Sequence, residues 1–265
     1  MKKLFIVSDV HGFYYEMIEA LNKVGFDENN DNHLLISVGD EFDRGPNALN
    51  VYRYLKRLYT KRKAIILKGN HTKFFVDYLK GVSISPFNYT RNGTDETIAD
   101  FMHQTQPFET WCALSHIDEP TFGDFATWIN IAGKEINEEY PELIDWLESR
   151  PYYYETENYI FTHGGMDGMC SDWHHPETKR FGMTGWEACI WDDGSFFGSE
   201  IKNTDKTVVI GHFGTSHLRR MYNIEDDGEY EILKRQDGRV IAIDATTVLS
   251  HKVNVLVIED NLLEE

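Results

Sequence analysis

Apolar residues follow two alternating patterns along the first 80 residues of the chain. Mostly apolar runs occupy residues 4–8, 34–38 and 64–67, and each has the length of a buried strand. Between them, residues 14–24 and 46–59 carry apolar side chains three or four positions apart, as an amphipathic helix does. Apolar strands that alternate with such helices are typical of a parallel sheet covered on both faces. The pattern therefore predicts an α/β fold.

Residues from about 82 to 150 interrupt this alternation. The spacing of their apolar positions predicts helices at 95–103, 122–131 and 141–148. Strand-like runs then resume at 152–154, 159–163, 207–210, 240–243 and 253–258. Because the strand pattern resumes, we interpret residues 1–265 as a single domain with a helical insertion at about 82–150. Long insertions of this kind often serve as lids, so this one is a candidate cap over a site.

Polar motifs follow several of the apolar runs directly. They are Asp9-Val10-His11-Gly12, Gly39-Asp40-Glu41-Phe42-Asp43-Arg44-Gly45, Gly69-Asn70-His71, His163-Gly164-Gly165 and Gly211-His212. In open α/β sheets, ligands bind beyond the carboxyl ends of the strands, so we expect these motifs to converge on one rim. Carboxylates, imidazoles and a carboxamide form the mixed oxygen and nitrogen set that suits two adjacent divalent transition-metal ions.

The motifs supply enough ligands for both ions. The expected ligands are Asp9 and His11 for one ion, Asp40 as the bridge, and Asn70, His163 and His212 for the other. The neutral Asn70 adds an oxygen ligand without adding another negative charge beside Asp40. A water shared by two ions loses a proton near neutral pH, and the resulting hydroxide can attack phosphorus in line.

Other residues in the motifs are candidates for catalysis and substrate binding. His71 follows a proposed ligand and is the candidate general acid, and Asp43 would hold its ring in the protonated form. Arg44 offers a planar fork for phosphate oxygens, and Lys68 and Asn70 are further candidate substrate-binding residues. Two alternatives stay open: Asp43 and Arg44 could form a structural ion pair at a helix start, and His71 could be only a supporting hydrogen-bond donor.

Composition narrows the partners. The net charge of −18 argues against binding a nucleic-acid polymer, although two bound dications would still make a site attractive to a small phosphorylated substrate. The three cysteines lack a CxxC spacing and are expected to be reduced thiols. No apolar run could span a membrane, and the N-terminal run is too short for a signal peptide. We therefore expect a cytoplasmic protein without a membrane partner; the oligomeric state stays open.

Together the motifs resemble the phosphoprotein phosphatase family of calcineurin-like metallophosphoesterases, most closely the bacterial and bacteriophage lambda-type serine/threonine protein phosphatases. Residues 24–40, the Asn92-Gly93 pair with Thr97, and Ile241-Ala242-Ile243-Asp244 also resemble that subgroup. The resemblance implies a central β-sandwich flanked by helices and two divalent metal ions, Mn²⁺ first, with Fe or Zn as alternatives. It also implies hydrolysis of phosphomonoesters, with phosphoserine or phosphothreonine in proteins as the expected substrate and a small phosphorylated molecule as the other possibility.

Three positions depart from the family pattern. Thr72 stands where GNHE motifs have glutamate, Lys68 stands where an arginine usually precedes GNH, and Asp193 stands where an arginine is expected after Trp191. The missing phosphate-binding arginine could be replaced by Arg91, Arg180 or Arg219. Two rival interpretations stay open. One is a symmetric dinucleoside tetraphosphatase, which resembles the same family and has the same metal ligands. The other is a non-catalytic phosphate-binding scaffold, which Thr72 and Asp193 motivate.

Overall fold

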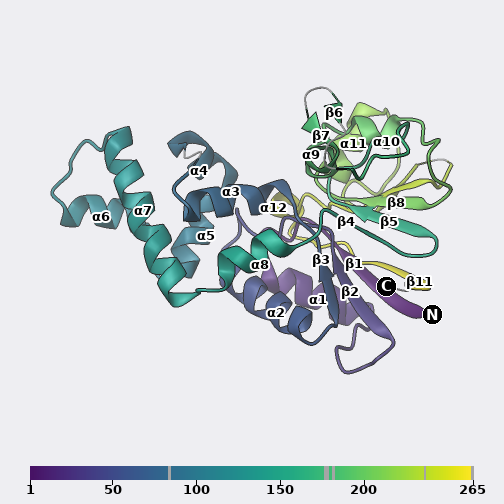
Figure 1. The fold of residues 1–265 in the computed structure, drawn as a ribbon, viewed down its shortest axis with the longest axis horizontal. Coiled ribbons are helices and arrows are strands. Elements are labelled where there is room, and N and C mark those ends of the chain that lie inside the picture. The colour runs from purple at the N-terminus through teal and green to yellow at the C-terminus, as the bar shows by residue number, and fades with distance from the viewer. Residues whose placement is uncertain (83–84, 176–178, 181–182, 236, 264–265) are drawn as a thin grey trace.

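Two β-sheets face each other in a computed structural model of the chain, and a group of helices extends from one end of this sandwich (Figure 1). The structure describes residues 1–82, 85–175, 179–180, 183–235 and 237–263, with the backbone alone at 179–180 and 183.

The first sheet contains the strands that were predicted in the first 80 residues. Its strand order is β11 (Leu256–Asp260), β1 (Lys2–Val7), β2 (His33–Ser37) and β3 (Ala64–Ile66). β1, β2 and β3 run parallel, whereas β11 pairs antiparallel with β1. The helices α1 (Tyr14–Lys23) and α2 (Ala48–Thr60) connect the parallel strands, as predicted.

The second sheet is built from the later strands. Its order is β4 (Tyr153–Glu155), β5 (Tyr159–Thr162), β8 (Thr207–Ile210), β10 (Val240–Ala242) and β9 (Leu233–Lys234). The inner strands β5, β8 and β10 are parallel, and the two edge strands are antiparallel. Between β5 and β11, the structure also describes β6 (Lys179–Arg180), β7 (Met183–Thr184), α9 (Gly185–Ile190), α10 (Ser195–Gly198), α11 (Thr215–Met221) and α12 (Thr247–Ser250).

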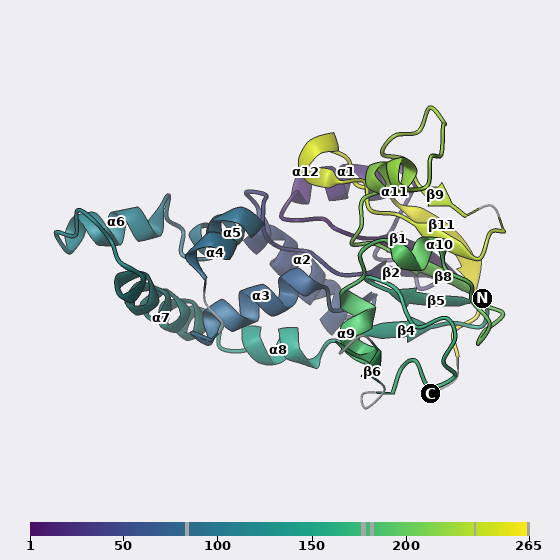
Figure 2. The ribbon, with the colours of Figure 1, turned by 90° about the horizontal axis from the view of Figure 1, so that it is seen from above.

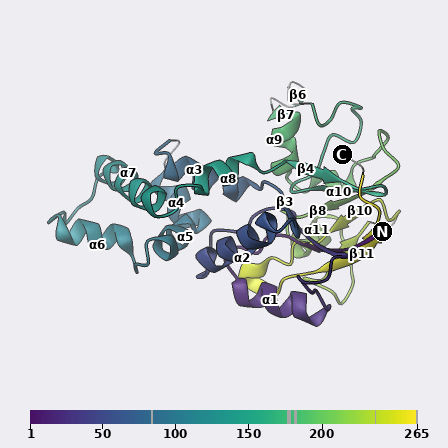
Figure 3. The ribbon, with the colours of Figure 1, turned by 60° about the horizontal axis from the view of Figure 1, so that its bottom comes forward.

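Alternation along β1 shows how the layers are held together. Leu4 and Ile6 are buried between the sheets, whereas Phe5 and Val7 point the other way and pack in the cluster that contains residues of α1 and α2. The helices α1 and α2 cover the outer face of the first sheet, and α9 lies outside the second sheet (Figure 3). The first sheet is therefore covered on both faces, as predicted, but one cover is the second sheet instead of a second layer of helices.

In its described residues, the segment between β3 and β4 contains helices joined by turns and loops, and no strand. It contains α3 (Asn70–Leu79), α4 (Pro86–Asn92), α5 (Thr94–Phe101), α6 (Pro107–Leu114), α7 (Phe122–Glu139) and α8 (Leu143–Ser149). Seen from above, α6 and α7 lie at the end of the molecule farthest from the termini (Figure 2). Within the described ranges, no helix has the length and apolar character needed to cross a membrane.

Candidate metal centre

The candidate ligands lie where strands end, as predicted. Asp9 follows β1, Asp40 follows β2, His163 follows β5 and His212 follows β8, while Asn70 opens the helix after β3. These strands belong to two different sheets, so the rim is formed by the carboxyl ends of both. The parallel direction of the inner strands is what brings residues more than 200 positions apart into one place.

The backbone at this rim adopts the left-handed conformation that side chains other than glycine rarely take. Six candidate residues have φ between 48° and 72°: Asp9, His11, Asp40, Asp43, Arg44 and His212. Each such residue costs about 1–3 kcal/mol and persists only where its surroundings enforce it. Here the loops after β1 and β2 bind each other, because the His11 N–H donates to the Asp40 carbonyl over 3.0 Å and the Gly12 N–H to the Glu41 carbonyl over 2.8 Å.

Two glycines allow the loops to approach closely. A Cβ atom at Gly69 would collide with the Asp40 carboxylate, and one at Gly211 would collide with the side chains of Ser8 and Asp9. Any other residue at these positions would push apart the strand ends that carry the candidate ligands.

The buried side chains form two groups that share one carboxylate. His11, Asp40 and His71 offer ligand atoms within 4.8 Å of one another, and so do Asp40, His163 and His212. The sharing of Asp40 is the arrangement that a bridging ligand requires. Asn70 joins the second group, because its carboxamide oxygen lies 3.0 Å from His163 Nε2.

Asp9 lies beside the first group. Its Oδ1 is 3.9 Å from His11 Nε2, and its Oδ2 accepts hydrogen bonds from the Ser8 hydroxyl and, over 2.9 Å, from the His212 N–H. Asp9 therefore joins the ends of β1 and β8 while one oxygen faces the cluster. The structure also places His71, the candidate general acid, within the first group.

Hydrogen bonds fix the orientation of three imidazoles. His11 Nδ1 donates to the Phe42 carbonyl over 2.8 Å, and His163 Nδ1 donates to the Val38 carbonyl over 2.9 Å. A carbonyl oxygen can only accept, so the proton lies on Nδ1 and Nε2 faces the cluster. His71 is held similarly, since its Nδ1 lies 2.7 Å from Asp43 Oδ2. Imidazoles held in this way by a second partner are the usual form of metal-binding histidine.

Burial and mutual attraction shift the pKa values in this cluster in opposite directions. Burial opposes ionisation of Asp40 and His163, but their attraction outweighs it, so the Asp40 pKa falls well below its usual value and the His163 pKa rises to about 9. Burial and the neighbouring His163 lower the pKa of His212 to about 4, and burial raises that of Asp9 to about 6. His163 thus carries a proton that a bound metal would replace.

The donor set fits divalent transition-metal ions. His163 Nε2 faces two oxygens, Asp40 Oδ2 at 3.1 Å and Asn70 Oδ1 at 3.0 Å, in a fully buried setting. Three kinds of donor atom that converge there, with a shared carboxylate, match the preference of Mn²⁺, Fe²⁺ and Zn²⁺ for mixed nitrogen and oxygen sites.

Arg44 spans the first group from its exposed position. Its Nη1 lies 2.9 Å from His11 Nε2 and its Nη2 lies 3.0 Å from His71 Nε2. A guanidinium group only donates, so both ring nitrogens accept here and carry no proton. Asp43 pairs with His71, and no ion pair joins Asp43 to Arg44 within the described residues. The alternative of an Asp43–Arg44 structural ion pair is therefore wrong.

The helical segment holds Asp43 in place. Asp43 is fully buried and accepts hydrogen bonds from the hydroxyls of Thr94 and Thr97, both over 3.0 Å. The Thr97 hydroxyl also accepts from the Asp43 N–H, and the Arg44 N–H donates to the Gly93 carbonyl. The start of α5 therefore orients the carboxylate that orients His71. The family resemblance included Gly93 and Thr97, but it did not predict their hydrogen bonds to the Asp43–Arg44 loop. It did not include Thr94.

Thr72, which stands where GNHE motifs have glutamate, contacts a buried ion pair between Arg150 and Glu41. Arg150 donates to Glu41 over 2.7 Å and to the Thr72 hydroxyl over 3.0 Å, and the side chains of Arg150 and Glu41 are fully buried. Glu41 also accepts a 2.6 Å hydrogen bond from Ser37. Thr72 is therefore part of a polar network that ties α3 to the loop after β2. Neither Glu41 nor Arg150 had a predicted role.

Lys68 lies apart from the cluster. Its ammonium group is 4.4 Å from the centre of the Tyr152 ring, and it lines a surface hollow with Glu148 and Trp186. None of its described contacts reaches the candidate metal ligands. The structure thus gives no support to Lys68 as a substrate-binding residue.

The other departures have local roles. Asp193 is exposed and accepts a hydrogen bond from the Ser195 N–H at the start of α10. Arg219 pairs with Asp226 over 2.7 Å and donates to nearby carbonyls, so it is used structurally. Arg91 is exposed and lies over the Phe87 ring. The Arg180 side chain falls outside the described part of the chain.

A pair of half-buried aromatic rings borders the cluster. Phe74 lies 5.4 Å from His71 and 5.5 Å from Trp191, and Trp191 lies 6.1 Å from His212, all between ring centres. Because Phe74 and Trp191 are both partly exposed, they present apolar ring surface to solvent next to the candidate metal ligands. Phe75, in contrast, is fully buried in the core.

Comparison with known proteins supports the family resemblance. The profile of the calcineurin-like phosphoesterase family matches residues 2–243. An asymmetrical bis(5'-nucleosyl)-tetraphosphatase PrpE from Halalkalibacterium halodurans is 33% identical over 101 residues, which are 36% of this chain and 39% of that protein. A symmetrical bis(5'-nucleosyl)-tetraphosphatase from Proteus mirabilis is 42% identical over 67 residues, 25% of this chain and 23% of that protein. The chain thus matches well under half the length of these relatives.

Solved structures of low sequence identity share the fold. A protein serine/threonine phosphatase from Saccharomyces cerevisiae, similar to human phosphatase PP5, matches with a TM-score of 0.51 and 13% identity over 100% of this chain and 81% of that one. A cold-active protein-tyrosine phosphatase from a psychrophilic Shewanella matches with a TM-score of 0.51 and 18% identity over 98% and 76%. The predicted metallophosphoesterase fold is confirmed, and the chain belongs to the calcineurin-like phosphoesterase family.

Proposed function

We propose that this chain hydrolyses dinucleoside polyphosphates, with bis(5'-nucleosyl) tetraphosphates as the preferred substrate. One observation supports hydrolysis: among the described residues, two groups of possible metal ligands share the Asp40 carboxylate. The substrate class rests on the names of the relatives and on the aromatic pair beside the cluster.

The cluster would hold two divalent ions, with Mn²⁺ as the first candidate. The proposed ligands are Asp9, His11 and Asp40 for one ion, and Asp40, Asn70, His163 and His212 for the other. Bound ions of this kind lower the pKa of a water molecule and offset phosphate charge. The protein's contribution is to keep the Nε2 atoms pointing inward through the carbonyls of Phe42 and Val38.

Arg44 and His71 act on the substrate in this proposal. The Arg44 fork can bind two phosphate oxygens at once, and it would leave the ring nitrogens of His11 and His71 to do so. His71 then takes up a proton at Nε2 and gives it to the departing oxygen. Asp43, 2.7 Å from Nδ1, stabilises the protonated ring.

The aromatic pair gives a reason to favour a nucleotide. A nucleobase can stack on an exposed aromatic face, and such stacking contributes about 1–3 kcal/mol per base. Phe74 and Trp191 provide that surface beside His71 and His212. A phosphoseryl side chain carries no nucleobase that could stack there.

A substrate comparison tests this proposal. Purified protein with added Mn²⁺ is expected to cleave diadenosine tetraphosphate with a kcat/KM at least about tenfold above that for a phosphoseryl peptide. Release of two ADP molecules would indicate symmetric cleavage, and ATP with AMP asymmetric cleavage. The Phe74→Leu and Trp191→Leu variants should raise KM for diadenosine tetraphosphate but leave turnover of inorganic tripolyphosphate, which has no base, unchanged. Equal effects on both substrates would contradict base stacking.

A protein serine/threonine phosphatase is the second candidate. The observation that favours it is the start of α5, because the Gly93 and Thr97 positions that resemble lambda-type phosphatases bind the Asp43–Arg44 loop directly. Faster turnover of the phosphoseryl peptide than of diadenosine tetraphosphate would support a protein serine/threonine phosphatase instead. If neither substrate nor p-nitrophenyl phosphate is cleaved by the Mn²⁺-loaded protein, the non-catalytic scaffold is the better account.

A further inference from the structure

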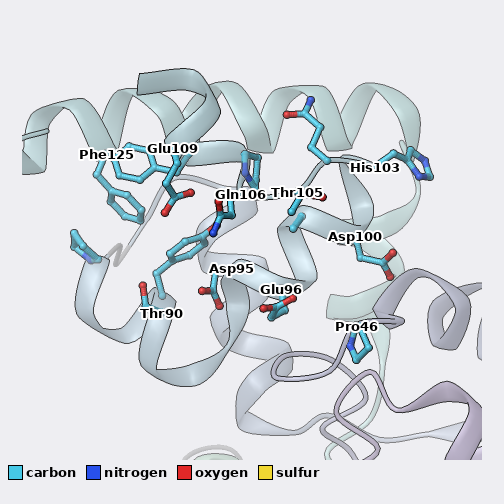
Figure 4. A pocket seen from close by; sticks show the side chains of 16 residues that line it. Pro46, Thr90, Asp95, Glu96, Asp100, His103, Thr105, Gln106, Glu109 and Phe125 are labelled. Atoms are coloured by element: carbon cyan, nitrogen blue, oxygen red, sulfur yellow. The ribbon is translucent and has the colours of Figure 1, made fainter. Parts of the chain in front are cut away.

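A second cavity lies within the helical segment, away from the candidate metal ligands. It has a volume of about 540 Å³ and is lined by residues of α4, α5, α6 and α7, with Pro46 at the side that faces the sandwich (Figure 4). Its size suits a small organic ligand. None of the motifs that predicted the metal centre contributes to it.

This cavity is lined by carboxylates that form no ion pair with any residue in the described ranges. Asp95 and Glu96 lie on one side, and Glu109 lies on the opposite side (Figure 4). Asp100 is also present and accepts a 2.7 Å hydrogen bond from the Leu49 N–H. No lysine or arginine is among the lining residues, and the one histidine, His103, pairs with Glu139 outside.

Asp95 has lost part of its hydration and is repelled by neighbouring acids. Asp95 is half-buried, and this burial, together with the nearby Glu96 and Asp43, raises its pKa to about 6. Asp95 accepts hydrogen bonds from its own backbone N–H and that of Glu96, which offset part of this effect, but it has no ion-pair partner among the described residues. A positive group that binds beside it would therefore stabilise its charged form.

Tyr89 is an independent indication of a ligand. Its side chain is only 5% exposed and lines the cavity, yet its hydroxyl makes no hydrogen bond within the described part of the chain. Burial, with Asp95 and Glu109 close by, raises its pKa, so the hydroxyl keeps its proton and is available as a donor and acceptor. A hydroxyl without a protein partner can form a hydrogen bond with a ligand atom, which contributes about 0.5–1.5 kcal/mol.

The aromatic lining favours an organic cation. Tyr89, Phe108 and Phe125 form part of the wall, and the Tyr89 and Phe125 ring centres are 5.2 Å apart. Ammonium and guanidinium groups bind aromatic faces as well as carboxylates. A single metal ion fits less well. In the described residues, three or more carboxylate, imidazole or thiol ligands converge to within 4.8 Å only in the two groups that share Asp40.

We propose that this cavity binds an organic cation, a chain that carries ammonium or guanidinium groups, with its charges against Asp95, Glu96 and Glu109 and its carbon chain against the aromatic rings. Free polyamines and the basic side chains of a peptide both have this chemistry. The proposal does not depend on the hydrolytic activity, because binding can be measured without turnover.

Calorimetric titration of the full chain tests the proposal, with spermidine in one arm and an Arg-Lys-Arg peptide in the other. At least one of them should bind saturably, and the arm that binds identifies the source of the cation. The Asp95→Asn/Glu96→Gln variant should weaken binding at least about tenfold, and Tyr89→Phe should weaken it about threefold. Asp118→Asn/Glu119→Gln, which removes two charges from exposed positions outside the cavity, is the matched control and should change affinity less than about twofold.

Two results would overturn the proposal. One is the absence of saturable binding of either probe at millimolar concentration. The other is equal weakening by Asp118→Asn/Glu119→Gln and by Asp95→Asn/Glu96→Gln, because this would indicate attraction by the overall negative charge alone. Thermal melting of each variant confirms folding, and an Asp95→Glu variant, which keeps the charge, should retain binding within about threefold.

Discussion

The two acidic regions of this protein differ in what surrounds their carboxylates. At the strand ends, Asp40 is fully buried and lies within 4.8 Å of imidazole nitrogens on both sides. In the helical segment, Asp95, Glu96 and Glu109 face a cavity without any basic partner among the described residues. The same side-chain chemistry therefore has two outcomes. Carboxylates that converge with imidazoles suit a metal ion, whereas carboxylates spread around an aromatic wall suit a larger cation.

The largest expected effect is the loss of metal binding at Asp40. Asp40→Asn keeps the shape of the side chain but removes the charge that both groups share, so Mn²⁺ affinity should fall more than about 100-fold and hydrolysis more than about 1000-fold. Asp95→Asn removes an equal charge from the other region and should change Mn²⁺ affinity less than about twofold. Calorimetry with Mn²⁺ measures both. Comparable losses in the two variants would contradict the distinction between the regions.

A third acidic residue, Glu41, shows how a buried ion pair contributes to stability. Arg150→Met leaves Glu41 buried and unpaired, so the free energy of unfolding should fall by about 3–5 kcal/mol. The double variant Glu41→Leu/Arg150→Met removes both charges and should recover most of this loss. Urea unfolding measures each. A loss below about 1 kcal/mol in Arg150→Met would show that Glu41 is stabilised by Ser37 and other neighbours instead.

The strands and the rim could be predicted because their signals are local. An apolar run ends where a polar motif begins, and 207–210 was predicted to the residue. The run at 253–258 was less accurate, since β11 begins at Leu256. Before it, Asn254 donates to the carbonyls of Tyr230 and Ile243 instead of joining the sheet.

The helical segment was harder to predict because tertiary contacts define it. The helix predicted at 122–131 continues to Glu139 and includes Gly133, although glycine has a low helix propensity. Gly133 is needed there because a Cβ atom would collide with the Leu79 carbonyl of α3. The short helices α4 and α6 were missed. Likewise, the contacts of Thr94 with Asp43 and of Arg150 with Glu41 join residues about 50 to 110 positions apart, with no local pattern to reveal them.

A pH effect separates the two regions further. In metal-free protein the folded-state pKa of His163 is about 9, above the value of about 6.5 for an unfolded histidine. Its stabilising effect is therefore complete below pH 6.5 and is lost as pH rises through 9. The pKa values of Asp9, His212 and Asp95 are about 6, 4 and 6. These three groups are therefore largely deprotonated by pH 7 and contribute little to a change in stability above it.

Urea unfolding in EDTA at pH 7 and pH 9.5 should thus reveal a loss of stability of up to about 3 kcal/mol in the wild type. His163→Asn should remove most of this pH dependence. If the variant keeps the full dependence, another group is responsible.

The smallest expected effect tests the link between the regions. Thr97→Val keeps the side-chain shape but removes a hydrogen bond to Asp43 Oδ1 and the acceptor for the Asp43 N–H. Because Asp43 positions His71 without touching substrate, kcat should fall about tenfold while KM stays unchanged, and the alkaline limb of the pH profile should shift. Thr110→Val, at an exposed threonine of α6, is the matched control. An unchanged kcat and pH profile in Thr97→Val would mean that α5 only packs beside the metal centre and that the helical segment serves its own cavity alone.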